Sequence, residues 1–370
     1  MDVAIVKLGG AALTVKSRRG TIAARGFADC VETVARARAR GDGTRVIVAH
    51  GAGSFGHGAR CEWMTTTRWT DAEARACGCA RGGDVDGDEA FARGVDETRR
   101  KVRELNELVV SALVARGVNA RGVSPSRGGE GWETRGPGTP ASTSTAARDE
   151  VFEMCAKGIV PVIHGDVVRD AVQGTSVLSG DDIVAWCARW VAEADATAPP
   201  PRVVFCSDVF GVYAGPPKTS VVVDSDEYDV PLRVAEDEDA VLLRDIVTDA
   251  SGSWRCVSAS PLARLDETLP ASAVPTPTFT VADGVEDVTG GVEAKLAAAV
   301  AIASSLPPTD EPLVFLARAG AFRASDAPAR NHALDAILGH PRACRTDDDD
   351  DIPAIDRFVG TRVRRVDAAT

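Results

Sequence analysis

Short apolar runs recur along the chain, and three of them, Val3–Leu8, Val46–Ala49 and Ile159–Ile163, are followed by a glycine within two residues. Runs of this kind, unbroken by polar residues, are typical of strands buried on both faces of a parallel sheet. We therefore predict strands at Arg45–Ala49, Ile159–Ile163, Arg202–Cys206, Leu313–Leu316 and Asp2–Leu8, whose run contains one lysine. Two shorter and less apolar stretches, Val118–Val123 and Gly360–Val363, are also predicted to be strands.

Apolar residues spaced three and four apart predict amphipathic helices between these strands. In the longest helix, Glu89–Arg116, the apolar stripe consists of Leu105, Leu108, Val109 and Leu113. Further helices are predicted at Ile22–Arg40, Ala146–Lys157, Ile183–Val191, Lys295–Ser304 and His332–Leu338. The alternation of strands and helices indicates an α/β fold.

Three stretches interrupt this alternation. Cys61–Asp88 has glycine breakers, and Ser124–Thr145 is rich in glycine, serine, threonine and proline, so both are predicted to be irregular. Pro216–Pro275 is mixed in composition and contains prolines, and we interpret part of it as an insertion. The acidic run Asp347–Asp351 is predicted to be solvated.

Composition narrows the class of protein. The 370 residues are 44% apolar and carry a net charge of -12, which indicates a globular chain without a nucleic-acid surface. No apolar run approaches the ~20 residues of a membrane helix. Because a predicted strand begins next to Met1, no room is left for a leader peptide, and we expect a cytoplasmic protein.

The nine cysteines are scattered, with Cys77 and Cys79 as their only close pair. The chain contains neither a CxxC nor an HExxH motif, so we expect no metal ligands among these residues. The odd count and the apolar surroundings of several cysteines predict reduced thiols.

The sequence His50-Gly51-Ala52-Gly53-Ser54-Phe55-Gly56-His57 directly follows one of the predicted strands. Its glycines let the backbone turn sharply and bring N–H groups close to an anion. A strand that runs into a glycine-rich turn is a common phosphate site in α/β proteins. The alternative is a tight turn with two incidental histidines.

Other strand ends carry similar signals: Lys7-Leu8-Gly9-Gly10, His164-Gly165-Asp166, Ser179-Gly180-Asp181-Asp182, the Ser207–Tyr213 loop, and Gly290-Gly291 before Lys295. Carboxyl ends of strands are where open α/β sheets bind ligands. Each signal has a structural alternative, since Lys7 can reach water at an edge and acidic residues can cap a helix. The chain has no GxxxxGK[ST] motif, and no GxGxxG follows its first strand.

The order of these motifs resembles the amino acid kinase superfamily, and HGAGSFGH resembles its isopentenyl phosphate kinases. Fosfomycin kinases share a similar histidine and are the nearest alternative family. A non-catalytic nucleotide sensor is a further alternative. The resemblance covers Val3–Ser304, and a weaker similarity is found at Gly360–Val363. It implies a single three-layer αβα domain over residues 1–370 with a mainly parallel central sheet, a substrate half near 1–200 and a nucleotide half near 201–370. It also implies ATP, Mg²⁺ and a homodimer, with isopentenyl phosphate as the acceptor. We expect dimethylallyl phosphate to be accepted as well, because an apolar wall discriminates poorly between such isomers.

The resemblance assigns roles to individual residues. Lys16 corresponds to a lysine that stabilises the transition state, which replaces a reading of it as a solvated loop lysine. His57 corresponds to a histidine that holds the acceptor phosphate. The remaining matches are Ala52 and Gly165 on the acceptor side, and Lys7, Gly9, Gly10, Gly53, Asp208, Tyr213, Gly291 and Lys295 on the nucleotide side.

Four residues depart from the pattern of the superfamily. Ala11 stands where serine is common, His164 where tyrosine is usual, Phe210 where a second aspartate is frequent, and Val292 where methionine is common. No motif offers an arginine or lysine to bind an amino-acid carboxylate. We therefore expect the tail of the acceptor to meet apolar side chains of the predicted helix Glu89–Arg116.

Overall fold

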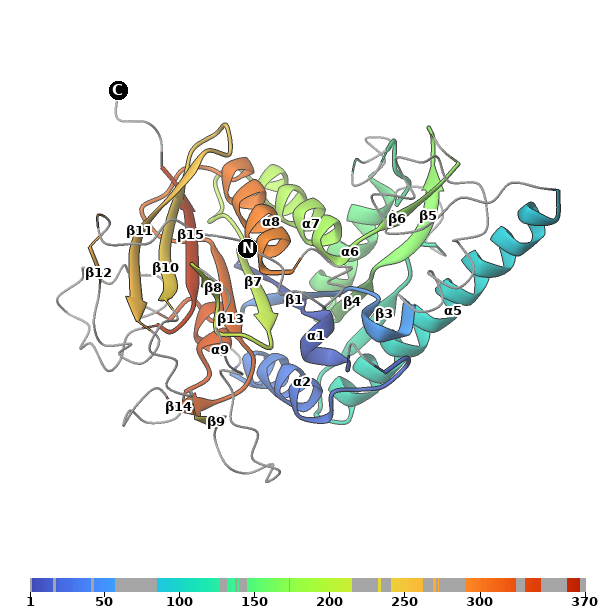
Figure 1. Ribbon diagram of the computed structural model, residues 1–370, viewed down its shortest axis with the longest axis horizontal. Coiled ribbons are helices and arrows are strands. Elements are labelled where there is room, and N and C mark those ends of the chain that lie inside the picture. Colours follow the sequence, from blue (N-terminus) through green and yellow to red (C-terminus); the bar gives the residue numbers. More distant parts are fainter. Residues whose placement is uncertain are drawn as a thin grey trace. The chain divides into compact units, whose positions relative to one another are not determined.

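The computed structural model describes residues 2–15, 18–40, 43–56, 85–126, 132–136, 139, 145–172, 174–214, 232–233, 241–261, 269–270, 272, 291–323, 330–340 and 358–366. The chain divides into two compact units. Figure 1 labels the helices and strands that make up each unit. Unit 1 comprises Met1–Val6, Ala28–Arg45 and Ala185–Thr370, and unit 2 comprises Lys7–Phe27 and Val46–Val184. Each unit is therefore discontinuous in sequence.

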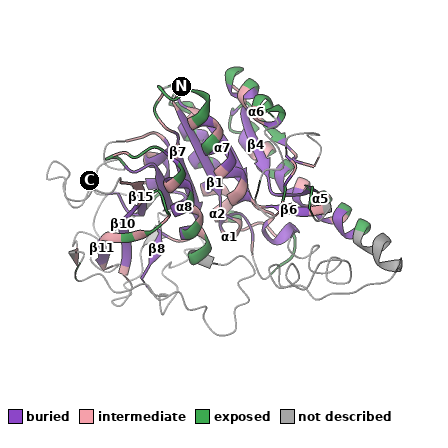
Figure 2. Ribbon diagram, turned by 90° about the horizontal axis from the view of Figure 1, so that it is seen from above, coloured by how far each residue is buried: buried purple, intermediate pink, exposed green. Residues whose placement is uncertain are grey.

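Unit 2 contains three parallel strands in the order β2-β4-β3, with His50 opposite His164. Helix α5 packs against β3 and β4, and α6 packs against β4. The elements are α1 (Gly10–Leu13), β2 (Arg45–His50), α5 (Val85–Val114), β3 (Ala120–Val123), α6 (Ala146–Ala156) and β4 (Val160–His164). Strand β4 is buried throughout, as its continuous apolar run predicts (Figure 2).

Helix α5 corrects one part of the predicted apolar stripe. Leu105, Val109 and Leu113 are fully buried, but Leu108 is 41% exposed. Positions 105, 109 and 113 are spaced four apart and continue the buried face back to Val102, whereas 108 is rotated away from it. The stripe is thus narrower than the sequence suggested.

A β-hairpin that we did not predict follows β4. Strand β5 (Asp166–Asp170) pairs antiparallel with β6 (Gly174–Leu178). Thr134, in a stretch predicted to be irregular, forms a bridge to Asp170 and donates a hydrogen bond of 2.6 Å to its carboxylate. Polar residues inside β5 and β6 had hidden the hairpin, since neither strand is an unbroken apolar run.

Unit 1 contains strands in the order β12-β11-β10-β15-β13-β7-β1, with β8 paired to β10. Strands β7 and β13 are parallel, whereas β10, β11 and β12 pair antiparallel. These strands are β1 (Val3–Leu8), β7 (Arg202–Ser207), β8 (Val212–Tyr213), β10 (Val241–Thr248), β11 (Trp254–Pro261), β12 (Leu269–Pro270), β13 (Val314–Arg318) and β15 (Thr361–Arg365). The short strands β9 (Leu232–Arg233) and β14 (Phe322–Arg323) pair with each other.

Helices of unit 1 cover these strands. Helix α8 packs against β13 and β15, and α9 packs against β7 and β13. The helices are α2 (Ala24–Ala39), α8 (Gly291–Ser305) and α9 (His332–Ile337); α7 (Gly180–Ala194) begins in unit 2 and continues into unit 1. None of the described helices is both long enough and apolar enough to cross a membrane.

The interpretation of part of Pro216–Pro275 as an insertion is wrong for β10 and β11, which belong to the sheet. Their sequences include charged residues that break the apolar pattern. Asp245 is buried and forms an ion pair of 2.8 Å with Arg362, and its carboxylate also accepts a hydrogen bond of 2.6 Å from Ser258. Internal pairing permits burial of such charges.

Candidate active site

Glycine turns meet at the ends of β2 and β4 and at the start of α7, and we call Gly10, Gly51, Gly53, Gly165 and Gly180 the glycine cradle. A Cβ built on Gly180 would lie 2.9 Å from the Gly51 nitrogen, and one on Gly165 would lie 3.4 Å from the Gly180 nitrogen. A Cβ on Gly10 would lie 3.3 Å from the Gly53 Cα. The backbones thus approach more closely than side chains allow.

Thr14 fixes the glycine turn after β2. Gly53 has φ +52°, and the Thr14 hydroxyl accepts a hydrogen bond of 2.9 Å from the Ser54 N–H. The same hydroxyl donates to the Gly10 carbonyl at 2.8 Å. One buried side chain therefore ties the first glycine turn to the second.

Lys7 lies beside the cradle at the end of β1. Its side chain is buried, and its Nζ lies 2.6 Å from the Asp181 carboxylate in the first turn of α7. Asp182 instead closes a capping box: its carboxylate accepts from the Ser179 nitrogen and hydroxyl, and its own N–H donates to that hydroxyl. Of the two acidic residues, one caps the helix and the other binds the lysine.

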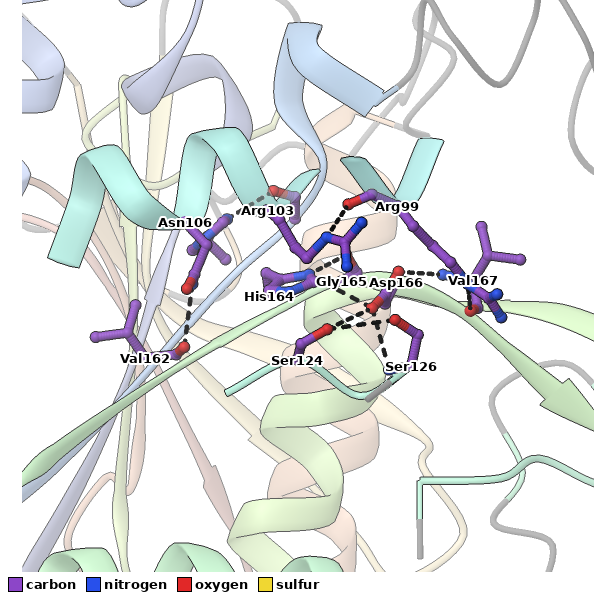
Figure 3. A network of polar contacts seen from close by, with 12 residues as sticks. Arg99, Arg103, Asn106, Ser124, Ser126, Val162, His164, Gly165, Asp166 and Val167 are labelled. Atoms are coloured by element: carbon purple, nitrogen blue, oxygen red, sulfur yellow. Dashed lines mark hydrogen bonds and ion pairs between the residues drawn. The ribbon is translucent and has the colours of Figure 1, made fainter. Parts of the chain in front are cut away.

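Gly165 contributes to the cradle because a glycine, which has no side chain, lets the neighbouring backbones approach closely. Its N–H donates to the His50 carbonyl at 2.7 Å, so this donor is already engaged. Beside it, the Asp166 carboxylate accepts hydrogen bonds from Ser124 and from the backbone nitrogens of Ser126 and Val167 (Figure 3). Asp166 thereby joins the ends of β3 and β4 to the start of β5.

His164, which departs from the family pattern, is buried under α5 (Figure 3). Its Nδ1 lies 3.0 Å from the Gly165 carbonyl and 3.9 Å from the Asp166 carboxylate. Burial lowers its pKa, although Asp166 opposes that shift.

The second group of candidates lies in unit 1, in the Ser207–Tyr213 loop after β7. The Lys295 Nζ lies 3.1 Å from the Ser207 hydroxyl and 4.0 Å from the Asp208 carboxylate. Arg318 donates to the Asp208 carbonyl. Lys295 therefore faces the side chain of Asp208, while Arg318 holds its backbone carbonyl.

Tyr213 is buried, and its hydroxyl accepts a hydrogen bond of 3.4 Å from the Phe210 nitrogen. Burial raises the pKa of this phenol. Phe210 is also fully buried, with the Arg318 guanidinium 5.8 Å from its ring centroid. The loop is therefore held by side chains from two elements.

Lys16 and His57 lie outside the described residues, as does Gly290. Gly291 begins α8, four residues before Lys295. The described residues include no group of three or more His, Cys, Asp or Glu side chains that could hold a metal ion. Among the described cysteines, Cys30, Cys155, Cys187 and Cys206 are buried thiols.

A sequence profile described as the amino acid kinase family matches residues 2–246. The chain belongs to the amino acid kinase family. The isopentenyl phosphate kinase of Arabidopsis thaliana is 31% identical over 260 residues, which cover 70% of this chain and 61% of that relative. The isopentenyl phosphate kinase of Haloferax volcanii is 32% identical over 212 residues, 57% of this chain and 71% of that protein.

Solved structures agree on the fold. X-ray structures of an isopentenyl phosphate kinase align with a TM-score of 0.57 at 19% identity, covering 98% of this chain and all of that one. A product complex of the Thermoplasma acidophilum isopentenyl phosphate kinase aligns with a TM-score of 0.55 at 20% identity and the same coverage. The prediction of an α/β sandwich with a mainly parallel sheet is confirmed.

Sequence reasoning missed several residues that shape these groups. Thr14, Asn106 and Arg318 carry no local motif, and their partners lie 40, 56 and 110 positions away in the chain. Only Asp181 had a local signal, its place in the first turn of a helix, and that signal also fitted capping.

Proposed function

We propose that this family member transfers the γ-phosphoryl group of ATP to isopentenyl phosphate, giving isopentenyl diphosphate and ADP. The glycine cradle with Lys7 is the observation that carries this proposal. It brings closely packed glycine backbones together beside one cation, and Lys7 is buried there against Asp181. The names of the relatives, isopentenyl phosphate kinases, support the choice of acceptor.

The acceptor is already an anion, so its phosphate oxygen can attack without a carboxylate base. A new P–O bond forms at the γ-phosphorus, and the bond to the ADP oxygen breaks. Such transfer depends mainly on positioning and on neutralising charge. In this mechanism Lys7 and Lys16 offset the charge of the transferred group, while the Ala52 N–H and His57 hold the acceptor phosphate.

In the same proposal the Ser207–Tyr213 loop and Lys295 bind the nucleotide. Mg²⁺ is generally held by ATP oxygens together with one or two carboxylates rather than by a dedicated protein cage. The carboxylates of Asp181 and Asp208 already face lysines. In this proposal Mg²⁺ would therefore be held mainly by oxygens of ATP. We also propose a cytoplasmic homodimer, which light scattering and localisation of a tagged chain would test.

An ADP-release assay with a panel of acceptors tests the proposed function. We expect turnover of isopentenyl phosphate and, within about two orders of magnitude in kcat/KM, of dimethylallyl phosphate, because an apolar wall separates such isomers weakly. Acetylglutamate should be inert. Activity on fosfomycin alone would show that the acceptor is a phosphonate and not isopentenyl phosphate. ATP binding without any turnover would indicate a nucleotide sensor.

A further inference from the structure

His50 ends β2 directly before the glycine turn, and its ring is completely buried. Both ring nitrogens have partners. Nδ1 lies 2.9 Å from the carbonyl oxygen of Gly51, and Nε2 lies 3.0 Å from the side-chain nitrogen of Asn106 on α5. The ring therefore links a helix to the turn.

The partners of Asn106 determine which nitrogen of His50 carries hydrogen. The Asn106 amide nitrogen also lies 3.0 Å from the Val162 carbonyl, which can only accept a hydrogen bond (Figure 3). That carbonyl fixes the orientation of the amide, whose second hydrogen then points to Nε2 of His50. Nε2 must accept, so Nδ1 holds the ring hydrogen and donates it to Gly51.

The ring is neutral at neutral pH. Burial lowers the pKa of His50 to about 4, and the nearby His164 ring adds to that effect. A neutral imidazole carries one hydrogen. The tautomer is thus selected by Asn106 and not by a charge.

The hydrogen bond to Gly51 also sets the direction of the next N–H. The Gly51 carbonyl and the Ala52 N–H belong to one planar trans peptide and point in opposite directions. Within the part of the chain that the structure describes, no acceptor is bonded to the Ala52 N–H, while the Ala52 carbonyl accepts from Gly56 at 3.1 Å. Holding the Gly51 carbonyl in place therefore fixes the direction of the Ala52 N–H.

We infer that His50 is a positioning residue, which Asn106 locks in the Nδ1–H tautomer so that the Gly51–Ala52 peptide presents its N–H to the acceptor phosphate. The inference rests on the proposed function, which places that phosphate at Ala52. His164 makes the same contact with Gly165 on the neighbouring strand. Among the described residues, however, its Nε2 has no hydrogen-bond partner, so no amide locks this second ring.

The tautomer can be measured on the wild-type protein by the ¹⁵N chemical shifts of the His50 ring. We expect hydrogen on Nδ1 and a bare Nε2. His332 provides an internal reference, because its Nδ1 accepts from the Val359 nitrogen and its ring must hold hydrogen on Nε2. A His50 ring with hydrogen on Nε2 would overturn the inference, whatever the activity of the protein.

Two substitutions test the consequence for binding. An asparagine amide can replace the Nδ1 donor of histidine, whereas a longer glutamine amide reaches the position of Nε2. His50→Asn should keep the KM for isopentenyl phosphate within about threefold, and His50→Gln should raise it about tenfold or more, by analogy with misplacing one oriented donor. The KM for ATP should stay within about twofold in both. Equal increases in the acceptor KM would contradict the inference.

His332→Gln is the matched control, since it changes a buried histidine of unit 1 outside both groups of site residues. It should lower stability and leave both KM values unchanged. Failure of the proposed function has a different signature: the wild type would not turn over isopentenyl phosphate, and the ¹⁵N shifts would still decide whether the lock exists.

Discussion

The two groups of candidate residues differ in whether backbone or charged side chains form them. In unit 2 the cradle consists of glycine backbones, and buried side chains such as Thr14 orient them. In unit 1 the Ser207–Tyr213 loop exposes the Asp208 carboxylate, which faces Lys295, while Arg318 donates to the Asp208 backbone carbonyl. A backbone cradle suits a small phosphate that is held closely, whereas charged side chains reach a larger, more highly charged ligand.

This difference predicts distinct sensitivities. Added atoms should damage the cradle, because its backbones already lie at contact distance. Removed charges should damage the loop, because Lys295 pairs with the Asp208 carboxylate and the Arg318 guanidinium donates to the Asp208 carbonyl. Three substitutions test the contrast, and a change of pH gives the baseline that the two units share.

The largest effect should come from acid, and it should strike both units. Burial lowers the pKa of His50 to about 4 and that of His332 to about 3, below the usual value near 6.5. The unfolded chain therefore binds more protons below pH 6.5, so stability is full above that pH and falls as pH drops. The loss is about 2 kcal/mol for each histidine at pH 5.

Denaturant titrations at pH 7.5 and pH 5 measure this loss. The two histidines belong to different units, so probes in both units should report lower stability at pH 5. Equal stability at the two pH values would show that neither ring is buried as a neutral group.

Gly180→Ala should act on the cradle. The new Cβ would lie 2.9 Å from the Gly51 nitrogen and 3.0 Å from the His50 carbonyl carbon, and both are backbone atoms that must then shift. A displacement of about 1 Å in a binding group can lower the rate about 10²-fold, which we expect for kcat/KM. Gly51→Ala is the steric control for stability, since its Cβ would meet no described atom within 4 Å. Similar melting temperatures and wild-type kinetics for Gly180→Ala would refute the cradle.

The sequence was most informative where one residue type carries its own signal. The continuous apolar runs of β1, β4 and β7 located these strands, and glycines marked the turns that form the cradle. The β5–β6 hairpin and strands β10 and β11 were missed because polar residues interrupt their apolar runs. Asp245 and Arg362 satisfy each other only across strands, and no local pattern reveals such a pair.

The same limit applies to the candidate site. Gly180 and Lys7 were visible as a turn glycine and a lysine at a strand end, but the ion pair of Lys7 with Asp181 spans 174 positions. Asn106 looked like one polar residue of a helix, and its contact with His50 depends on how α5 packs on β4. Side-chain orientation of this kind is a product of packing and not of local propensity.

Lys295→Met should act on the nucleotide side alone. Lys295 donates to Ser207 and faces Asp208, so its loss should raise the KM for ATP about tenfold or more, the usual scale of a charge-assisted hydrogen bond. The acceptor KM should change less than about twofold. Lys157→Met is the control, because Lys157 is 62% exposed and pairs with Glu153 on α6. Equal changes in both KM values would erase the contrast between the two groups.

The smallest effect should come from Arg318→Lys, which keeps the charge but loses the planar guanidinium. That group donates to the Asp208 carbonyl and lies 5.8 Å from the centroid of the Phe210 ring. We expect the KM for ATP to rise about threefold, since one hydrogen bond of this kind contributes about 0.5–1.5 kcal/mol.

Arg364→Lys is the matched control for Arg318→Lys, because its guanidinium also donates to a backbone carbonyl, that of Asp310, at an exposed position. It should leave the KM for ATP unchanged. If Arg318→Lys behaves identically, the loop does not depend on Arg318 and is held by Tyr213 and by Thr361, whose hydroxyl accepts from the Val212 nitrogen at 2.8 Å. In that case unit 1 would resemble unit 2, with buried neutral side chains orienting backbone.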